Sequence, residues 1–497
     1  MSILGIEFGS TRIKAVAIDG ACRVIASGTR DWENKREHGY WTYDLADVQD
    51  GARRALAGLD LHGVEALGIS AMMHGYLAFD KDGSLLTPFR AWRNTTTEQA
   101  ARELSELFGF NIPQRWSVAH LYQAILDGEA HVKDIAFLTT LAGYVHWRLT
   151  GQKALGVGDA SGMFPVTDGN YDAGMAEKFQ RLTGLDWFAI APRVLRAGGS
   201  AGTLTETGAD WLGVPRDLAG LPLCPPEGDA GTGMAATNAV APRTGNVSAG
   251  TSIFAIAVLE QPLSRAYPEI DMVATPAGAP VAMVHCNTCT SDLDAWVKLF
   301  GELSPLSLPQ LYDFLYNKAL EAEPDAGGLV NFNCYAGEPV VNLGEGCPLL
   351  TRAAGSNLTL ANFMRAQLFS PLAALRIGMD LLFNRERVIL DRLVGHGGLF
   401  KTKGAGQRLI AGALEVPVAV METAGEGGPW GMALLAAYML RGQGRDLHAF
   451  LSDIFSSAET SVAAPEADIT SGFAAYLARY KACLPAERAA AEGLRHA

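Results

Sequence analysis

The sequence lacks an apolar run of the ~18 to 20 residues that a membrane-spanning helix needs. Its amino terminus enters a strand-like stretch without the basic region and cleavage site of a secretory leader. Cysteine is also scarce, because only seven occur in 497 residues, and an odd number spread over a long chain does not form a disulfide framework. These absences predict a cytoplasmic protein.

Basic residues are the minority among the charges. The chain has 40 Lys and Arg against 53 Asp and Glu, a net charge of −13. Nucleic-acid phosphates require a basic face, so this balance argues against such a partner. The hydrophobic share of 48% is typical of a globular protein, and the length favours two or three domains.

One cysteine pair has the spacing of a redox or zinc motif. Cys286 and Cys289 are separated by two residues, and His285 precedes them. The other half of a four-ligand site is missing, and Thr290 opens a pattern typical of a helix start. We therefore predict that the pair packs the start of that helix.

Strand-like and helical patterns alternate in the first half, which predicts an α/β fold with helices covering a sheet. Expected strands lie at 3–7, 15–19, 24–28 and 66–71, with a helix at 45–59; residues 95–190 read as a mostly helical insertion. In the second half we expect helices at 292–303 and 358–383, a strand at 387–390 and a surface helix at 486–492.

Two stretches about 240 residues apart repeat a strand, a tight turn and a second apolar strand. The turns are Gly9-Ser10-Thr11 and Gly250-Thr251-Ser252. Each can present consecutive backbone N–H groups and a hydroxyl to an anion, because Gly allows close approach of the backbone. The repeat predicts two phosphate-binding turns, and it predicts a duplicated chain with a hinge near 240–245.

Several separated segments resemble the FGGY-type carbohydrate kinases, in the family's order and over essentially the whole chain. They are Glu7 to Lys14, Met72 to Gly75, Gly228 to Gly231, Ser248 to Ser252, Asn333 to Pro339, Gly395 to Gly398, and Gly425 to Gly431. The Met-His-Gly segment is most similar to that of xylulokinases, with ribulokinases close behind. Two departures are Glu7, where the family usually has Asp, and Arg93-Asn94, where xylulokinases typically have Asn-Asp.

The resemblance implies a duplicated actin-like (ribonuclease H-like) ATPase fold with two domains flanking a catalytic cleft. The expected domains are 1–243, which binds the sugar, and 244–497, which binds ATP. The implied reaction transfers the γ-phosphoryl group of ATP to a ketopentose hydroxyl, most simply xylulose, with Mg²⁺ as cofactor. Ribulose, fuculose, rhamnulose or a polyol stay open as acceptors, as does a homodimer. A non-catalytic actin-like nucleotide switch is the alternative of another class.

The resemblance also assigns residues. Asp229 is the expected general base, an N-cap being its structural alternative, and Glu7 and Asp229 are the expected carboxylates near the metal. The expected sugar-binding residues are Met73, His74, Gly75, Trp92, Arg93, Asn94 and Asp229. The expected nucleotide-binding residues are Gly9, Ser10, Thr11, Lys14, Gly250, Thr251, Ser252, Gly397, Gly398, Gln407 and Gly427.

Overall fold

The structure is a computed structural model that describes every residue except 422–426, 457–459 and 496–497. The chain divides into two compact units. Unit 1 consists of Met1–Pro242, Glu260–Val281 and Glu426–Ala458, and unit 2 of Arg243–Leu259, Ala282–Gly425 and Glu459–Ala497. Each unit is therefore assembled from segments that are distant in the sequence.

The units differ from the predicted domains at two segments of the second half. The predicted ranges were continuous, 1–243 and 244–497, whereas the segments Glu260–Val281 and Glu426–Ala458 pack with unit 1. The first is held there because Ala274 N–H donates to Ser161 Oγ at 2.9 Å. The second is held because Trp430 Nε1 donates to the carbonyl of Cys22 at 2.9 Å. Such long-range packing leaves no local signal in the sequence.

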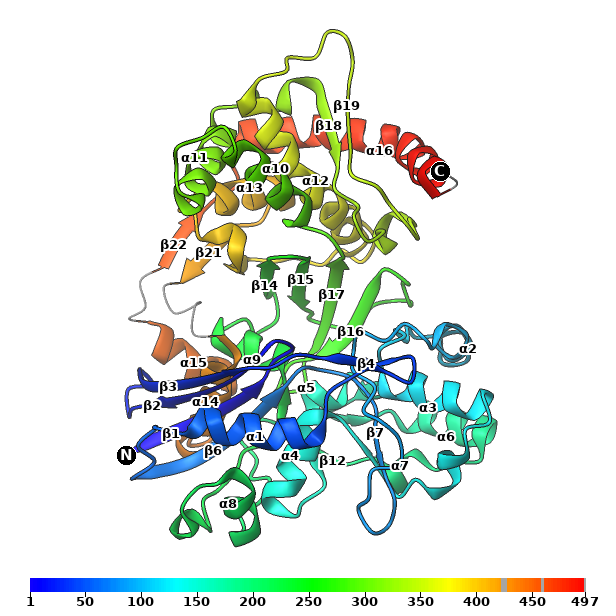
Figure 1. Cartoon of the computed structure of the whole chain (residues 1–497), viewed down its shortest axis with the longest axis vertical. Helices are drawn as coiled ribbons and strands as arrows, with labels where there is room; N and C mark the ends of the chain where they lie inside the picture. The colour runs from blue at the N-terminus through cyan, green and yellow to red at the C-terminus, as the bar shows by residue number, and fades with distance from the viewer. Residues whose placement is uncertain (422–426, 457–459, 496–497) are drawn as a thin grey trace. The chain divides into compact units, whose positions relative to one another are not determined.

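Unit 1 contains a five-stranded sheet with the order β13-β6-β1-β2-β3 (Figure 1). β1 pairs antiparallel with β2 and parallel with β6, which pairs parallel with β13. The strands are β1 (Ser2–Phe8), β2 (Arg12–Ile18), β3 (Val24–Asp31), β6 (Val64–Ala71) and β13 (Glu227–Gly228). The expected strands of the first half are confirmed.

Helices cover both faces of this sheet. On one face α1 (Leu45–Leu56) packs so closely that a Cβ on Gly51 would lie 2.3 Å from Ile13. On the other face α14 (Gly427–Arg441) approaches Gly5, where a Cβ would lie 2.1 Å from the carbonyl oxygen of Pro429. Successive residues of a strand point to opposite faces, and both faces of the central strands β1 and β6 are therefore buried, whereas the edge strand β3 is largely exposed.

The remaining elements of unit 1 are mostly helical between residues 95 and 190, as predicted. The helices are α2 (Glu98–Phe108), α3 (Ser117–Leu126), α4 (Leu141–Thr150), α5 (Val157–Ala160), α6 (Ala173–Thr183), α7 (Trp187–Ile190), α8 (Glu206–Leu212), α9 (Asp229–Ala236) and α15 (Leu447–Phe455). Short strands are β4 (Lys35–Glu37), β5 (Tyr40–Thr42), β7 (Leu77–Phe79), β8 (Phe137–Thr139), β9 (Ala154–Gly156), β10 (Val166–Thr167), β11 (Asn170–Tyr171), β12 (Arg193–Leu195) and β16 (Ile270–Ala274).

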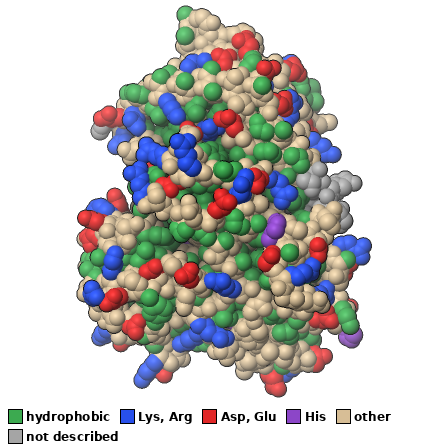
Figure 2. Space-filling model, turned by 180° about the vertical axis from the view of Figure 1, so that it is seen from behind, with side chains coloured by type: hydrophobic (Ala, Val, Ile, Leu, Met, Phe, Trp, Pro, Cys, Tyr) green, Lys and Arg blue, Asp and Glu red, His purple; other side chains and the backbone are tan. Residues whose placement is uncertain are grey.

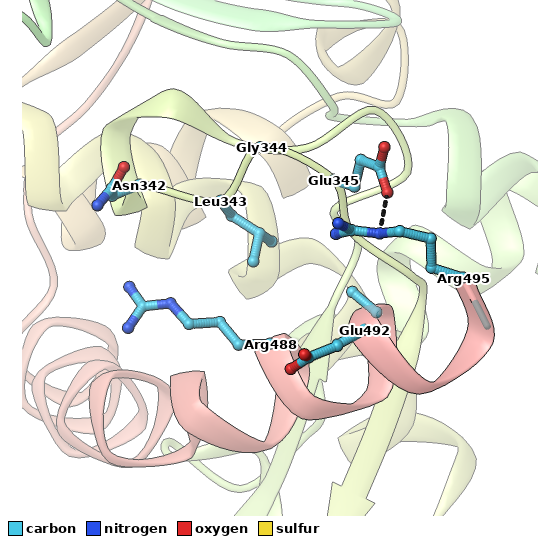
Figure 3. A pocket seen from close by; sticks show the side chains of 8 residues that line it. Asn342, Leu343, Gly344, Glu345, Arg488, Glu492 and Arg495 are labelled. Atoms are coloured by element: carbon cyan, nitrogen blue, oxygen red, sulfur yellow. Dashed lines mark ion pairs between the residues drawn. The ribbon is translucent and has the colours of Figure 1, made fainter.

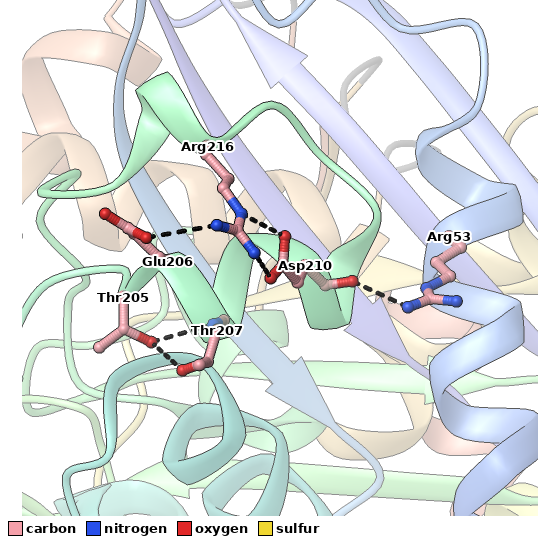
Figure 4. A network of polar contacts seen from close by, with 7 residues as sticks. Arg53, Thr205, Glu206, Thr207, Asp210 and Arg216 are labelled. Atoms are coloured by element: carbon pink, nitrogen blue, oxygen red, sulfur yellow. Dashed lines mark hydrogen bonds and ion pairs between the residues drawn. The ribbon is translucent and has the colours of Figure 1, made fainter.

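A polar network joins α8 to α1 at the surface of unit 1 (Figure 4). Arg53 of α1 donates to the carbonyls of Asp210 and Trp211 at 2.8 and 2.9 Å. Arg216 donates from Nε to the Asp210 carboxylate at 2.8 Å. Exposed ion pairs contribute only about 0 to 1 kcal/mol, so the network orients α8 more than it stabilises the unit.

Unit 2 repeats the strand connections of unit 1. β14 (Thr244–Ala249) pairs antiparallel with β15 (Ile253–Val258) and parallel with β20 (Arg392–His396), as β1 pairs with β2 and β6. β21 (Val418–Met421) extends the sheet parallel to β20, and β22 (Thr460–Ala463) pairs antiparallel with β21. β17 (Pro280–Cys286) adjoins β15 in the same sheet. The repeated topology supports the predicted duplication.

The helices of unit 2 surround a long central helix, α12 (Leu360–Asp380). The stretch Leu360–Arg385 is the single candidate membrane span among the described residues, yet 72% of its most apolar 18-residue window is buried inside the protein, as in a core helix. The other elements are α10 (Ser291–Gly301), α11 (Leu308–Leu320), α13 (Ala405–Leu414), α16 (Ala467–Arg495), β18 (Leu329–Phe332) and β19 (Leu349–Arg352). The expected helices at 292–303 and 358–383 are confirmed.

One expectation for the second half is wrong, and another is confirmed. Residues 387–390 form no strand: Arg387 has a φ of +57°, and the strand begins at Arg392. The tail at 486–492 lies in α16, with most of its residues exposed, as expected of a surface helix. Its inner edge includes Glu487, which is buried and accepts a hydrogen bond from Cys347 N–H at 2.9 Å.

The surface mixes charges of both signs, as the face in Figure 2 shows. Cys286 and Cys289 are both buried and free, ahead of α10. Among the residues that the structure describes, no group of three or more His, Cys, Asp or Glu side chains is arranged for a metal ion. Cys289 N–H donates to the carbonyl of Thr251 at 2.7 Å, so this cysteine packs between a turn and the start of α10.

Candidate active site

Aromatic side chains hold the first glycine turn, between β1 and β2. Trp32 Nε1 donates to the carbonyl of Gly9 and Tyr43 Oη to the carbonyl of Ser10, each at 2.7 Å. Trp92 Nε1 donates to Ser10 Oγ at 3.0 Å. These bonds occupy two carbonyls of the turn, and Thr11 remains exposed. The turn is thus rigid, which suits a preformed anion site.

Glu7 stands at the end of β1, directly across from Lys14 of β2. Its Oε2 is buried and has no hydrogen-bond partner in the described structure. Burial, followed by the nearby negative charge of Asp229, raises the pKa of Glu7 to about 8, and Lys14 lowers it in part. An unpartnered carboxylate oxygen in this position needs a proton or a cation.

Helix α14 begins against the same carboxylate. A Cβ on Gly428 would lie 1.9 Å from Glu7 Oε2 and 3.0 Å from Thr232 Oγ1, so only glycine fits there. Mg²⁺ prefers oxygen ligands and is usually held by one or two carboxylates plus waters and phosphates. The oxygen donors of Glu7, with Asp229 close by, fit that requirement. Gly427 is the first residue of α14 and belongs to unit 1, whereas Gly425 and Glu426 lie outside the described residues.

Asp229 is the first residue of α9, and the helix N-cap is Gly228, so the N-cap alternative is excluded. Its Oδ1 accepts hydrogen bonds from the N–H groups of Met73 and Ala230, at 3.2 and 3.0 Å. The side chain remains accessible to solvent. Desolvation by the surrounding protein raises the pKa of Asp229 above its ordinary value, although these N–H groups and Arg115 lower it in part. Within the part of the chain that the structure describes, these hydrogen bonds fall on Oδ1 and leave Oδ2 without a donor.

His74 is held as a neutral imidazole. It is buried, and desolvation lowers the pKa of its ring to about 3. Nδ1 lies 3.1 Å from the carbonyl oxygen of Gly162, which can only accept, so Nδ1 carries the proton and Nε2 is an acceptor. His74 has a φ of +69° and Gly75 one of +90°, and a Cβ on Gly75 would meet Phe89 at 2.7 Å. Backbone held in this strained region is typical of functional sites.

The segment 92–94 differs from the prediction that all three side chains face a sugar. Asn94 is buried, and its amide bonds the backbone of Trp41 twice and that of Ala91 once, at 2.8 to 2.9 Å. The Arg93 guanidinium lies 4.8 Å from the ring centre of Trp41. Trp92, as described above, bonds Ser10 of the predicted phosphate turn. Asn94 therefore fixes the local backbone, because its polar atoms are already used.

Unit 2 brings its own predicted residues together. The carbonyls of Gly250 and Thr251 accept from the N–H groups of Thr290 and Cys289, at 3.1 and 2.7 Å, so the turn is tied to the residues before α10. Gly397 has a φ of +103°, and a Cβ there would lie 2.5 Å from the carbonyl oxygen of Ala249. Exposed backbone of Gly397 and Gly398 thus lies beside the end of β14.

Gln407 is not free to reach a nucleotide. It is 6% exposed, and its Nε2 donates to the carbonyls of Val418 and Ser461, each at 2.8 Å. Its Oε1 accepts from Ser461 Oγ at 3.3 Å. The side chain joins α13 to the strands β21 and β22, which corrects the predicted nucleotide contact. The helical position was clear from the sequence, but the long-range partners were not.

Three ionisable residues around Asp229 belong to none of the sequence motifs. Asp159 is fully buried, and desolvation raises its pKa to about 7. Glu227 is also buried, with a pKa raised to about 8 by burial and by Asp159. Arg115 forms an ion pair with Asp271. The one feature of the sequence that could have indicated these residues was the position of Glu227, an acidic residue two positions before Asp229.

A surface hollow of about 470 Å³ lies elsewhere in unit 2, between residues 342–345 and the last turns of α16 (Figure 3). Arg495 Nε pairs there with Glu345 at 2.7 Å. None of the predicted site residues lines it. The hollow is therefore separate from the candidate site.

Comparison with known proteins gives matches along most of the chain. The N-terminal domain of the FGGY family of carbohydrate kinases matches residues 2–220, and the C-terminal domain of that family matches residues 245–440. Xylulose kinase of Staphylococcus xylosus is 23% identical over 237 residues, which is 44% of this chain and 47% of that protein. That match spans about half of the relative's length.

Solved structures share the fold over nearly the whole chain. A kinase of Brucella ovis described as a xyloylose kinase superposes with a TM-score of 0.82 at 20% identity, over 98% of this chain and 100% of that one. Gluconate kinase of Lactobacillus acidophilus gives 0.83 at 16% identity, over 99% of both chains. Proteins named for different acceptors thus match equally well, so the fold does not select the acceptor.

Proposed function

The chain belongs to the FGGY family of carbohydrate kinases, and from that membership we propose that it transfers the γ-phosphoryl group of ATP to a hydroxyl of a ketopentose, xylulose first. The observation that supports this most is the pairing of Asp229 with the His74 segment. Met73, directly before His74, donates its N–H to Asp229, and this contact supports a joint role for the two residues, Asp229 as the proposed base and His74 as the proposed hydroxyl ligand.

In this proposal the acceptor sugar binds to unit 1. His74 Nε2 accepts a hydrogen bond from one sugar hydroxyl, because Nδ1 is already committed to Gly162. Asp229 Oδ2 accepts the proton of the attacking hydroxyl while Oδ1 stays bonded to Met73 and Ala230. As the new O–P bond forms, the bond to the β-phosphate oxygen breaks and ADP leaves. General-base assistance of this kind contributes about 10²- to 10⁴-fold.

The phosphate turns supply backbone N–H groups, which position the charged phosphates and stabilise the loose transition state of phosphoryl transfer. We assign Gly9, Ser10 and Thr11 of unit 1 to phosphate binding, with Lys14 as a nearby cation. We assign Gly250, Thr251 and Ser252 of unit 2 to phosphate, and Gly397 and Gly398 to the nucleoside. Mg²⁺ held near Glu7 and Asp229 would neutralise phosphate charge.

A coupled ADP-release assay tests the proposal. The acceptor panel contains D- and L-xylulose, D- and L-ribulose, fuculose, rhamnulose, glycerol and gluconate, each with ATP and Mg²⁺. The expected result is acceptor-dependent ADP release that is highest with a xylulose. Highest activity with another acceptor would make that compound the substrate in place of xylulose. The absence of ADP release with every acceptor would overturn the proposed reaction in favour of a nucleotide switch.

A further inference from the structure

A buried carboxylate joins two segments directly behind Asp229. Glu227 is 1% exposed, and its two oxygens accept separate backbone hydrogen bonds. Oε1 accepts from Gly158 N–H at 3.2 Å and Oε2 from Asp159 N–H at 2.9 Å. A third bond, from Gly156 N–H to the carbonyl of Pro226, measures 2.7 Å. The turn at residues 156–159 is thereby attached to the strand that leads into Asp229.

Three glycines line the space that the Glu227 carboxylate occupies, and none of them has a side chain to fill it. A Cβ on Gly156 would lie 2.2 Å from Glu227 Oε1, and one on Gly158 would lie 2.4 Å from Oε2. A Cβ on Gly231, in the first turn of α9, would lie 2.9 Å from Oε2. Real side chains do not tolerate such approaches, so the absence of side chains at all three positions matches the presence of Glu227.

The backbone that follows Glu227 is closely packed against the segment that holds Asp229. Gly228 pairs in parallel register with Ala71, two residues before Met73, whose N–H bonds Asp229. A Cβ on Gly228 would lie 2.7 Å from Met73 Cγ and 3.1 Å from Asp159 Oδ1, so this backbone has no room to shift. Displacement of the turn at 156–159 would therefore move the strand end and rotate Asp229.

We propose that Glu227 is a positioning residue for phosphoryl transfer: its carboxylate clamps the turn at residues 156–159 to the end of β13 and so orients the Asp229 carboxylate toward the acceptor hydroxyl. The inference rests on the proposed function of Asp229. An amide cannot take the place of Glu227: either oxygen of a carboxyl group, ionised or protonated, keeps a lone pair for an N–H, whereas an NH₂ group facing the second N–H has none.

Chemical rescue tests the role. Glu227→Ala leaves a space of carboxylate size that is lined by glycines and two N–H donors, which formate can enter. We expect kcat to fall by about tenfold or more, because small displacements of reacting groups have effects of this size, while the KM for ATP stays within about twofold. Formate should restore kcat in a saturable way, whereas chloride should not. Glu227→Gln should be impaired and unresponsive to formate, because its amide fills the space.

Glu65→Ala is the matched control, since Glu65 lies at the surface of unit 1 and pairs with Arg441. It should keep the parental kcat and show no response to formate. Hydrogen exchange of the Met73 amide gives a readout that does not need activity: exchange should accelerate in Glu227→Ala and slow again with formate. If Glu227→Ala does not fold, Gly158→Ala displaces the same carboxylate and should lower kcat in the same way.

The outcomes separate the two proposals. Wild-type protein without acceptor-dependent ADP release would overturn the proposed function, and the Met73 exchange would then decide the clamp alone. An active wild type with unchanged kcat and Met73 exchange in Glu227→Ala would overturn the clamp. A loss of kcat that formate does not relieve would also overturn it, because the side chain would then serve only packing.

Discussion

Two residues with adjacent backbones divide the chemistry at the acceptor side of the site. His74 is kept neutral by burial and can accept through Nε2, whereas Asp229 stays accessible to solvent, and its Oδ2 has no donor among the described residues. A neutral imidazole does not compete for the hydroxyl proton, because its pKa of about 3 lies below the ordinary range. In the proposed function the carboxylate is therefore the base, and the histidine orients the sugar.

Replacing Asp229 by Asn should reduce kcat by about 100-fold or more, because an amide of the same shape keeps the bonds to Met73 and Ala230 but cannot accept a proton. ATP and sugar affinities, measured by calorimetric titration, should remain close to those of the parent. Asp217→Asn, at an exposed position of unit 1, is the control and should leave kcat unchanged. Retention of kcat within about threefold in Asp229→Asn contradicts the base assignment.

Trp92 connects the predicted sugar segment to the predicted phosphate turn. We expect Trp92→Phe to raise the KM for ATP by about three- to tenfold, since one hydrogen bond to Ser10 Oγ is worth roughly 0.5 to 1.5 kcal/mol. The preference among ketopentoses should not change. Ser10→Ala should have the same effect, and the double variant should add little, because both changes remove one bond. Additive losses, or a changed sugar preference, argue for a direct sugar contact.

At the scale of elements, the start of α14 and the end of β1 together determine where the Glu7 carboxyl group lies. Gly428 leaves space for Glu7 Oε2, and Glu7 is held at a pKa of about 8 by the same packing. Helix N-termini favour negative charge, so α14 assists any anion that binds there. Both elements belong to unit 1, although they lie at opposite ends of the sequence.

Gly428→Ala should displace the Glu7 carboxylate, because its Cβ would lie 1.9 Å from Oε2. We expect kcat to fall by about tenfold or more, with a lower melting temperature, since overpacking costs about 1 to 3 kcal/mol. Gly233→Ala in α9 is the matched control, because its Cβ would enter open space. Equal kcat and melting temperature in the two variants show that the space at Gly428 has no role.

Local patterns predicted the elements that depend on local chemistry. The turns at Gly9 and Gly250, the surrounding strands and most helices follow from glycine, hydroxyl and apolar spacing. The bonds of Asn94 and Gln407, and the clamp of Glu227, were missed because each depends on backbone that is distant in sequence. The same holds for the segments that cross into unit 1.

At the scale of the whole molecule, the free energy of unfolding of unit 1 should depend on pH through two sets of buried groups, histidines and carboxyls, whose effects oppose each other. Burial lowers the pKa of His74 and His120 to about 3 and of His146 to about 4. The unfolded chain therefore binds more protons than the folded one at these histidines below pH 6.5. Their contribution to stability is complete above that value and is lost as pH falls.

The buried carboxyl groups change stability with pH in the opposite direction. The pKa values of Glu7 and Glu227 are raised to about 8 and that of Asp159 to about 7, so the folded protein holds extra protons between their ordinary and raised values. Stability from these groups is lost as pH rises toward 8. Each group changes the free energy of unfolding by about 1.4 kcal/mol per pH unit within its window.

The two sets cancel between about pH 4.5 and 6.5, so we expect a stability maximum there and a decline on both sides. Calorimetry of the ligand-free protein, without Mg²⁺ or ATP, should show the melting transition of unit 1 falling from pH 6.5 to 8. In Asp159→Asn the melting transition should fall less steeply over this pH range, because one of the three buried carboxyl groups no longer titrates. A transition that instead rises steadily to pH 8 contradicts the assignment of buried neutral carboxyls.

The segment order of unit 1 also has a consequence for synthesis on the ribosome. β1 emerges first, but α14, which covers one of its faces, begins only at Gly427. At about 5 to 20 residues per second, the roughly 420 intervening residues take about 20 to 80 s to make. During that time one apolar face of the amino-terminal sheet is uncovered. The nascent chain therefore presents a binding surface for chaperones that the finished protein no longer has.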